Sequence, residues 1–284
     1  MNIAVSGATG FIGSALCEYL RLRGHQIFPL GRDLLTNGKE LTEIIDKSEV
    51  IINLAGAPIN RRWSRSYKKV LEESRIKTTN GIVTAINATS GEKLLISASA
   101  VGYYPSTGEC FGDALQSPSG ENFLASLCVK WESEANKTRR GVRCAITRFG
   151  IVMDPYGGAF PQMVKPAKAG MSVVIGNGRQ SLPWIDRRDL IRAMEHIIIN
   201  KELCGTFNFV APQRLSQKNF AKITGKHYGV HLTVHIPAIF FKMILGEASQ
   251  FITGGQCAVP EKLQKSGFEF TSPDLETFLA NMYK

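Results

Sequence analysis

The sequence has no long apolar run and no low-complexity segment, and each absence excludes a class of protein. No stretch approaches the roughly 20 apolar residues that a membrane-spanning helix needs. A predicted strand starts within two residues of the amino terminus, which leaves no room for a signal peptide. We therefore expect a cytoplasmic protein without a membrane partner. With no linker and no internal repeat, any second lobe is expected to pack on the first.

Cysteine and histidine are too scattered to indicate a framework or a metal site. The five histidines offer only one close pair, His231 and His235, in a strand-like stretch, and we assign them no metal. The cysteines form no C-x-x-C pair, so we expect no disulfide and buried thiols in a reducing compartment. They are Cys17, Cys110, Cys128, Cys144, Cys204 and Cys257.

Against these absences stands a glycine turn, Gly-x-x-Gly-x-x-Gly, at residues 7–13. It follows the apolar run at residues 3–5 and precedes a helix-patterned segment at residues 14–23. A strand, a glycine turn and a helix start in that order form the phosphate-binding unit of a dinucleotide fold. Gly7 permits a tight turn, Gly10 lets the backbone approach a diphosphate, and Gly13 lets the helix pack on the strand.

Short β-branched runs alternate with helical patterns through the first half of the chain. The runs are continuous rather than alternating, which is typical of strands buried on both faces. We predict an α/β fold, a Rossmann-like doubly wound parallel sheet with a smaller α+β carboxy-terminal lobe. Residues 1–155 form the NAD(P)-binding domain, residues 156–230 add to its sheet and lid, and residues 231–284 form the small domain. The predicted strands are 26–30, 50–54, 93–96 and 143–147, and the longest predicted helices are 64–88 and 123–139.

The end of the second strand favours NADP over NAD. Gly31 stands where an acid would accept the 2'-hydroxyl of the adenosine ribose, and Arg32 follows with donors for a 2'-phosphate. Asp33 argues the other way, unless it is a solvated acid or a partner of Arg32. The net charge of +10 fits a basic cleft for such a cofactor and an anionic substrate. We expect no nucleic-acid partner, because the basic residues are spread along the chain without a recognition motif.

Further motifs resemble the extended short-chain dehydrogenases/reductases. These are the glycine turn, Asn53 to Ala57 after the third strand, and Ile96 to Ala100 at the end of the fourth. Other segments narrow the resemblance to the atypical epimerase-like, YfcH-type subgroup of the NAD-dependent epimerase/dehydratase family, which carries a small carboxy-terminal domain. They are Trp63 with Ser74-Arg75, residues 123–132, Gly157 to Ala159, Gly176 to Gln180, Pro183 to Ile185, residues 237–246 and residues 260–270.

The resemblance implies an NADP-binding protein related to epimerases and reductases. Extended relatives use a Tyr as acid/base, a Lys four residues later, and a Ser that polarises the substrate oxygen. Ser99 lies at the place of that Ser, with Ser97 or a purely structural hydroxyl as alternatives. No Tyr in the sequence has a Lys four positions on, and the two places fall on Leu124 and Cys128.

Two tyrosines after Ser99, Tyr103 and Tyr104, are the candidate replacements for the missing acid. Aromatic packing beneath the lid is the competing interpretation. Cys128 could act as a nucleophile only if a neighbour made it a thiolate, and we favour a buried helix cysteine.

Asp186 departs from the subgroup, which has His after Trp-Ile. Asp189 is predicted to cap the helix that runs to Asn200. Ser272-Pro273 is predicted to start the last helix.

Two further sets of residues complete the predicted site. The predicted cofactor contacts are Gly7, Thr9, Gly10, Phe11, Ile12, Gly13, Arg32, Leu54, Ala55, Gly56, Ser97, Ala98, Gly150 and Ile151. The predicted substrate contacts are Arg62, Trp63, Arg148, Gln180 and Trp184.

Two functions remain open from the sequence. The first is an NADP-binding epimerase or oxidoreductase that acts on a small anionic or sugar-like molecule. The second is a non-catalytic NADP-binding sensor or protein-interaction module, which the missing Tyr and Lys favour. Either protein is expected to be a monomer or a homodimer.

Overall fold

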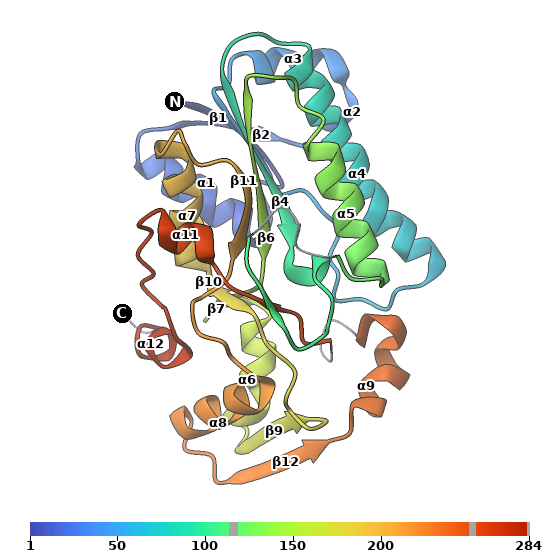
Figure 1. Cartoon of the computed structure of the whole chain (residues 1–284), viewed down its shortest axis with the longest axis vertical. Coiled ribbons are helices and arrows are strands. Elements are labelled where there is room, and N and C mark those ends of the chain that lie inside the picture. The colour runs from blue at the N-terminus through green and yellow to red at the C-terminus, as the bar shows by residue number, and fades with distance from the viewer. Residues whose placement is uncertain (114–118, 250–253, 283–284) are drawn as a thin grey trace.

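Six parallel strands form the central sheet of the protein, whose computed structural model describes residues 1–113, 119–249 and 254–282 (Figure 1). Their order is β2-β1-β3-β4-β6-β11, so the chain winds outward in both directions from β1 and β3. The prediction of a doubly wound parallel sheet is confirmed, although β4 and β6 run longer than expected. The strands are β1 (Asn2–Ser6), β2 (Gln26–Leu30), β3 (Val50–Asn53), β4 (Lys93–Ala100), β6 (Val142–Phe149) and β11 (Gly205–Phe209).

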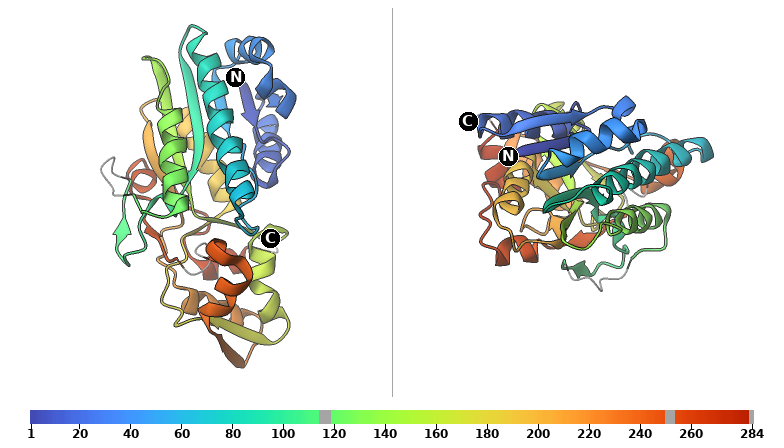
Figure 2. Two further views of the ribbon diagram at one scale, coloured as in Figure 1. Left: turned by 90° about the vertical axis from the view of Figure 1, so that its right-hand side faces the viewer. Right: turned by 90° about the horizontal axis from the view of Figure 1, so that it is seen from above.

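Helices cover both faces of the sheet, as its continuous apolar strands require. On one face the core joins Ile3 and Val5 of β1 to Leu16 and Leu20 of α1. On the other face, seen from the front in the left view of Figure 2, Ile51 of β3 joins the core with α3, α4 and α5. The first layer contains α1 (Phe11–Leu22), α7 (Arg187–Ile199) and α11 (Glu261–Lys265). The second contains α2 (Arg32–Thr36), α3 (Gly38–Asp46), α4 (Arg65–Asn87) and α5 (Phe123–Ala135).

A smaller lobe lies beyond the carboxyl ends of the strands (Figure 1). Its core packs Phe160, Trp184 and Phe278 edge to face. It combines segments from before and after β11, because β12 pairs in parallel with β9. The elements are β7 (Ile151–Asp154), β8 (Gly157–Gly158), α6 (Phe160–Lys168), β9 (Met171–Ile175), β10 (Trp184–Asp186), α8 (Gln217–His227), β12 (Leu232–Ile236), α9 (Ala238–Leu245) and α12 (Leu275–Ala280).

The expectation of no disulfide is wrong. Two short strands, β5 (Cys110–Phe111) and β13 (Cys257–Ala258), pair in parallel with Cys110 opposite Cys257. This register brings their Cα atoms to 4.4 Å, and the two cysteines form a disulfide across 147 positions of sequence. Cys204 is exposed, so the expectation of uniformly buried thiols is also wrong.

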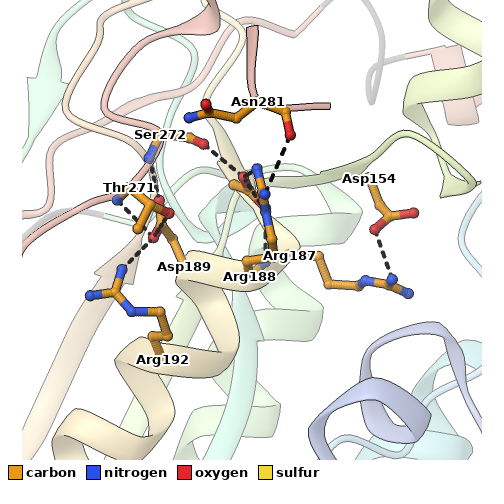
Figure 3. Close-up of polar contacts among 9 residues, drawn as sticks. Asp154, Arg187, Arg188, Asp189, Arg192, Thr271, Ser272 and Asn281 are labelled. Atoms are coloured by element: carbon orange, nitrogen blue, oxygen red, sulfur yellow. Dashed lines mark hydrogen bonds and ion pairs between the residues drawn. The ribbon is translucent and has the colours of Figure 1, made fainter. Parts of the chain in front are cut away.

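The predicted starts of α7 at Asp189 and of α12 at Ser272-Pro273 are both wrong. The reason is common to both, because Asp186 and Asp189 bind the segment at residues 271–272. Asp186 caps α7 by accepting from the backbone N–H of Arg188. Asp189 instead accepts from Thr271 and from the backbone N–H of Ser272 (Figure 3). Ser272 donates its hydroxyl to Asp186, and Asp274 caps α12. The two acids therefore fasten the carboxy-terminal segment to α7.

Within the described ranges, no helix is long and apolar enough to cross a bilayer. The same residues contain no cluster of three or more His, Cys, Asp or Glu side chains that could hold a metal ion.

Candidate functional site

The glycine turn between β1 and α1 has no room for a side chain at Gly7 or Gly13. Gly7 has φ of +70°, and a Cβ there would lie 2.9 Å from the carbonyl carbon of Leu54. A Cβ on Gly13 would lie 2.2 Å from the carbonyl oxygen of Gly7. The turn is closed by a 2.9 Å hydrogen bond from the N–H of Gly10 to the same carbonyl. These contacts fix the close backbone geometry that a bound dinucleotide requires.

The amino terminus of α1 is open to an anion. Its N-cap residue, Gly10, supplies no side-chain acceptor, and the first turn contains no acidic residue. The first backbone N–H groups of a helix have no partner within the helix. Thr9 and Gly10 are exposed, so these donors and the helix dipole are accessible to a phosphate. The residues present therefore fit a dinucleotide diphosphate.

A buried polar chain holds the neighbouring strand end against this turn. Ser6 donates to Asn53 at 2.6 Å, and Asn53 donates to Thr79 at 2.8 Å. Trp131 donates its indole N–H to the same threonine. The N–H of Ala55 points back to Ser6 at 3.3 Å. The predicted cofactor loop at residues 54–56 is thus fixed by side chains from β1, α4 and α5.

Arg32 lies at the exposed end of β2, as the first residue of α2. Among the described residues it forms no ion pair, and Asp33 is not its partner. The space beside Gly31 is empty, since a Cβ there would meet no atom within 4 Å. An acid at position 31 would fit sterically. The structure therefore leaves a free guanidinium and no competing carboxylate at residue 31.

One contact of the glycine turn escaped the sequence analysis. The Phe11 ring packs against the β8 turn, since a Cβ on Gly157 or Gly158 would lie 2.7 Å from ring atoms. The Arg187 guanidinium lies 4.9 Å from the centroid of the Phe11 ring and forms a 2.8 Å ion pair with Asp154 (Figure 3). The motifs at residues 11 and 157–158 were both visible in the sequence, but nothing local indicated that they touch.

The candidate serine lies in a buried network. Ser99 is 2% exposed and donates its hydroxyl to Glu132 at 2.6 Å. Arg148 donates to the same carboxylate from Nε at 2.8 Å and from Nη2 at 2.7 Å. Burial opposes the charge of Arg148, but its hydrogen bonds and its attraction to Glu132 prevail and raise its pKa. The substrate contacts predicted for Ser99 and Arg148 stay predictions, and both side chains are engaged with Glu132.

The two candidate tyrosines differ in environment. Tyr104 is fully buried, stacks on Phe111, and exchanges hydrogen bonds with Arg148 and Asn208. Burial raises the pKa of its phenol, so it is a poor proton donor or acceptor at neutral pH. Tyr103 is partly exposed, and the Arg148 guanidinium lies 3.5 Å from its ring centroid. Tyr103 is therefore the better placed replacement for the missing acid.

The two helix positions that the sequence predicts for Tyr and Lys, Leu124 and Cys128, are apolar and buried. Leu124 packs against Gly102, because a Cβ placed on Gly102 would lie 3.4 Å from the Cβ of Leu124. The Cys128 thiol faces the carbonyl of Ala100 at 3.7 Å. Burial raises the pKa of Cys128 to about 12, which keeps it a thiol at neutral pH. Both side chains thus contact the residues at the end of β4, where the sequence predicts the acid/base group, and neither can act as one at neutral pH.

The predicted substrate residues do not form one cluster. Trp184 is fully buried in the core of the smaller lobe, and Trp63 donates its indole N–H to the carbonyl of Ile59. Gln180 donates to Ile175 and packs beside Gly255. Arg62 is exposed next to Gly246. Arg62 is therefore the predicted contact whose charge is most accessible from solvent.

Gly150 and Ile151 join the large sheet to the smaller lobe. A Cβ on Gly150 would lie 2.8 Å from the carbonyl oxygen of Pro183, and Ile151 donates its N–H to that oxygen at 2.8 Å. The predicted cofactor contacts Ser97 and Ala98 are buried in β4, where the hydroxyl of Ser97 has no hydrogen-bond partner among the described residues.

Residues 3–208 match the NAD dependent epimerase/dehydratase family, and residues 236–282 match a domain of unknown function, DUF1731. The chain is 33% identical to the epimerase family protein YfhF of Bacillus subtilis, over 99% of this chain and 98% of that one. It is 30% identical to epimerase family protein SDR39U1 of Mus musculus, over 99% of each chain.

A solved structure has the same fold over nearly its whole length. The crystal structure of human epimerase family protein SDR39U1 with NADPH superposes with a TM-score of 0.89, at 28% identity and over 99% of both chains. The predicted resemblance, including the small carboxy-terminal domain, is confirmed by these matches.

Proposed function

The chain belongs to the NAD dependent epimerase/dehydratase family, and from this premise we propose that it binds NADP at the carboxyl ends of β1 to β4. The glycine turn carries the proposal, because Gly7 and Gly13 occupy positions where any side chain would collide with backbone. The open amino terminus of α1 provides donors for the diphosphate. The human relative that shares the fold was crystallised with NADPH.

The preference for NADP over NAD rests on Arg32. Its guanidinium is exposed and unpaired among the described residues, next to an unhindered glycine. A charge-assisted hydrogen bond to a 2'-phosphate contributes about 1.5 to 3 kcal/mol, which corresponds to roughly a tenfold to hundredfold preference. Arg32→Ala should therefore weaken NADPH binding by that factor and leave NADH binding unchanged, as measured by isothermal titration calorimetry.

For the reaction, we propose an epimerase or oxidoreductase activity on a small anionic or sugar-like substrate. The nicotinamide would supply or accept a hydride, and the protein must move a proton. Tyr103 is the proposed acid/base, because it follows the end of β4, is partly exposed, and has the Arg148 guanidinium 3.5 Å from its ring centroid. Arg62 is the proposed anchor for substrate charge.

A non-catalytic NADP sensor or interaction module is the second candidate. The observation that favours it is the buried, apolar pair Leu124 and Cys128 at the positions of the family's Tyr and Lys. Such a protein would bind NADPH without turning it over.

Two measurements separate these outcomes. NADPH at a hundred times its dissociation constant should add about 2.7 kcal/mol to the stability seen by thermal shift, and no shift would contradict cofactor binding. Net NADPH oxidation with a panel of carbonyl compounds should reveal a reductase, and conversion of nucleotide sugars into their epimers, which leaves the cofactor unchanged overall, should reveal an epimerase. A positioned acid/base contributes typically 10² to 10⁴ in rate, so Tyr103→Phe should lower that turnover by about this factor. Turnover unaffected by the substitution would remove Tyr103 from the mechanism.

A further inference from the structure

Three arginines of the sheet-and-helix body, the buried Arg148 and the half-buried Arg75 and Arg143, differ in how many hydrogen bonds and ion pairs they form. Arg148 pairs with a carboxylate. Arg143 donates to four backbone carbonyls around the end of α7, those of Ile197, Ile198, Asn200 and Leu203. Arg75 donates to only two carbonyls and, among the described residues, forms no ion pair. A guanidinium has five N–H donors, so Arg75 has donors to spare.

The position of Arg75 is set by a glycine. Its Nη2 donates to the carbonyl of Ala57 at 3.0 Å, and its Nη1 donates at 3.3 Å to Leu71, one turn earlier in α4. A Cβ on Gly56 would lie 2.9 Å from Cζ of Arg75. Gly56 itself is exposed. The cation therefore lies directly beneath Gly56 in the loop that follows β3, and Gly56 has no side chain to cover it.

That loop borders the glycine turn. The ideal Cβ position of Gly7 is 2.9 Å from both the carbonyl carbon and the carbonyl oxygen of Leu54, and 3.1 Å from the nitrogen of Ala55. The open amino terminus of α1 and the Arg75 guanidinium thus approach the same edge of the sheet from two sides, one from the turn after β1 and the other from below the loop after β3.

Among the described residues, no carboxylate balances the charge of Arg75. Burial lowers its pKa, which means that the folded protein disfavours the charged form relative to water. The Trp131 ring, with its centroid 5.2 Å from Cζ, provides only a cation–π contact. The nearby Cys128 is a thiol and not a thiolate, because burial raises its pKa to about 12. A cation in such a place is stabilised when an anion binds within its reach.

We infer that Arg75 is a binding residue for the diphosphate of the dinucleotide, with its spare donors and its charge acting at Gly56 opposite the amino terminus of α1. The inference rests on the proposed NADP site and deepens it. Arg32 and Arg75 then divide the cofactor between them: Arg32 binds the 2'-phosphate that NADPH alone carries, and Arg75 binds the diphosphate that NADPH and NADH share.

This division gives a test with two ligands and three variants. Dissociation constants for NADPH and NADH are measured by isothermal titration calorimetry for the wild type, Arg75→Met, Arg75→Lys and Arg32→Ala. Arg75→Met should weaken both cofactors by the same factor, about tenfold to hundredfold. Arg75→Lys, which keeps the charge, should lose less. Arg32→Ala should weaken NADPH alone.

The stability of the ligand-free protein separates binding from a structural role. Methionine fills the volume of the arginine stem without a buried charge, so the melting temperature of ligand-free Arg75→Met should equal or exceed that of the wild type. Weakened binding accompanied by a lower melting temperature in both Arg75 variants would overturn the inference. That result is expected if Arg75 only holds the loop in place through its hydrogen bond to the carbonyl of Ala57. Unchanged affinities would overturn it while leaving the proposed function intact. A wild type that binds neither cofactor would remove the proposed function and the inference together.

Discussion

Two neighbouring edges of the same sheet use their polar groups in opposite ways. Around β1 and β2 the donors are held in place but lack partners: the first turn of α1 has no side-chain cap, and Arg32 has no ion pair among the described residues. Around β4 and β6 the polar side chains hydrogen-bond to one another, since Ser99 and Arg148 both bind Glu132. The first edge is built to receive an anion, whereas the second is closed by its own hydrogen bonds.

This difference shows that the two edges depend on different features of the chain. The edge around β1 and β2 depends on backbone geometry and on Gly7 and Gly13, where a Cβ would collide with backbone atoms. The edge around β4 and β6 depends on side chains: Ser99 and Arg148 bind Glu132, and the buried Leu124 and Cys128 stand at the two positions predicted for Tyr and Lys.

The largest effect is expected from breaking the closed edge. Glu132→Ala would leave the Arg148 guanidinium, 4% exposed, without its counter-charge. Removing one partner of a buried ion pair costs about 3 to 5 kcal/mol, which should appear as a lower free energy of unfolding in urea titrations. The matched control is Glu73→Ala, which removes an exposed ion pair with Lys77 and should change nothing measurable. Equal effects of the two variants would mean that the network is not closed.

A similar effect, on binding rather than stability, is expected at the open edge. In Gly13→Ala the new Cβ would lie 2.2 Å from the carbonyl oxygen of Gly7, so the turn must open and its N–H groups move away from the phosphates. Loss of one or two charge-assisted hydrogen bonds predicts NADPH binding weaker by roughly a hundredfold in calorimetry. Gly38→Ala, where nothing lies within 4 Å of a Cβ, is the control. Tight binding by Gly13→Ala would contradict the assignment of the turn.

A buried acid next to β11 and α11, Asp113, should also titrate. Its carboxylate is 2% exposed and accepts from the backbone N–H groups of Asn208 and Lys262. Burial raises the pKa of Asp113 from 3.8 to about 6, despite these hydrogen bonds. The folded state therefore holds its proton to a higher pH than the unfolded state. The stability that this proton contributes is complete below about pH 3.8 and is lost as the pH rises through 6.

The comparison of wild type with Asp113→Asn isolates this contribution. Between pH 4 and pH 7 the free energy of unfolding of the wild type should fall by about 2.4 kcal/mol relative to the variant, because a shift of one pKa unit corresponds to about 1.36 kcal/mol and part of the effect lies below pH 4. Urea titrations at several pH values measure the difference. Parallel pH profiles for the two proteins would show that Asp113 is not a buried, titrating group.

The open edge could be predicted from the sequence, whereas the hydrogen-bond partners within the closed edge could not. Gly7, Gly10 and Gly13 lie within one short segment, so their joint role follows from local spacing. The ends of the predicted strands likewise gave the position of Ser99 and of the helix that faces it. Local patterns carry this information because backbone geometry and strand burial are properties of neighbouring residues.

Contacts between distant segments left no such pattern. Glu132 was visible only as part of a helix, although it binds both Ser99 and Arg148. Cys110 and Cys257 are brought together by the pairing of two-residue strands. Asp189 stands at a helix start, where a cap is the usual role, but Thr271 and Ser272 compete for it from the far end of the chain. Such partners are chosen by the tertiary fold.

The most direct test of the contrast between the two edges is a crystal structure with NADPH bound. We expect the diphosphate within hydrogen-bond distance of the first N–H groups of α1, and the 2'-phosphate within the same distance of the Arg32 guanidinium. We also expect Glu132 to keep its bonds to Ser99 and Arg148. A cofactor bound elsewhere, or one that draws Arg148 away from Glu132 while Arg32 remains in solvent, would contradict this expectation.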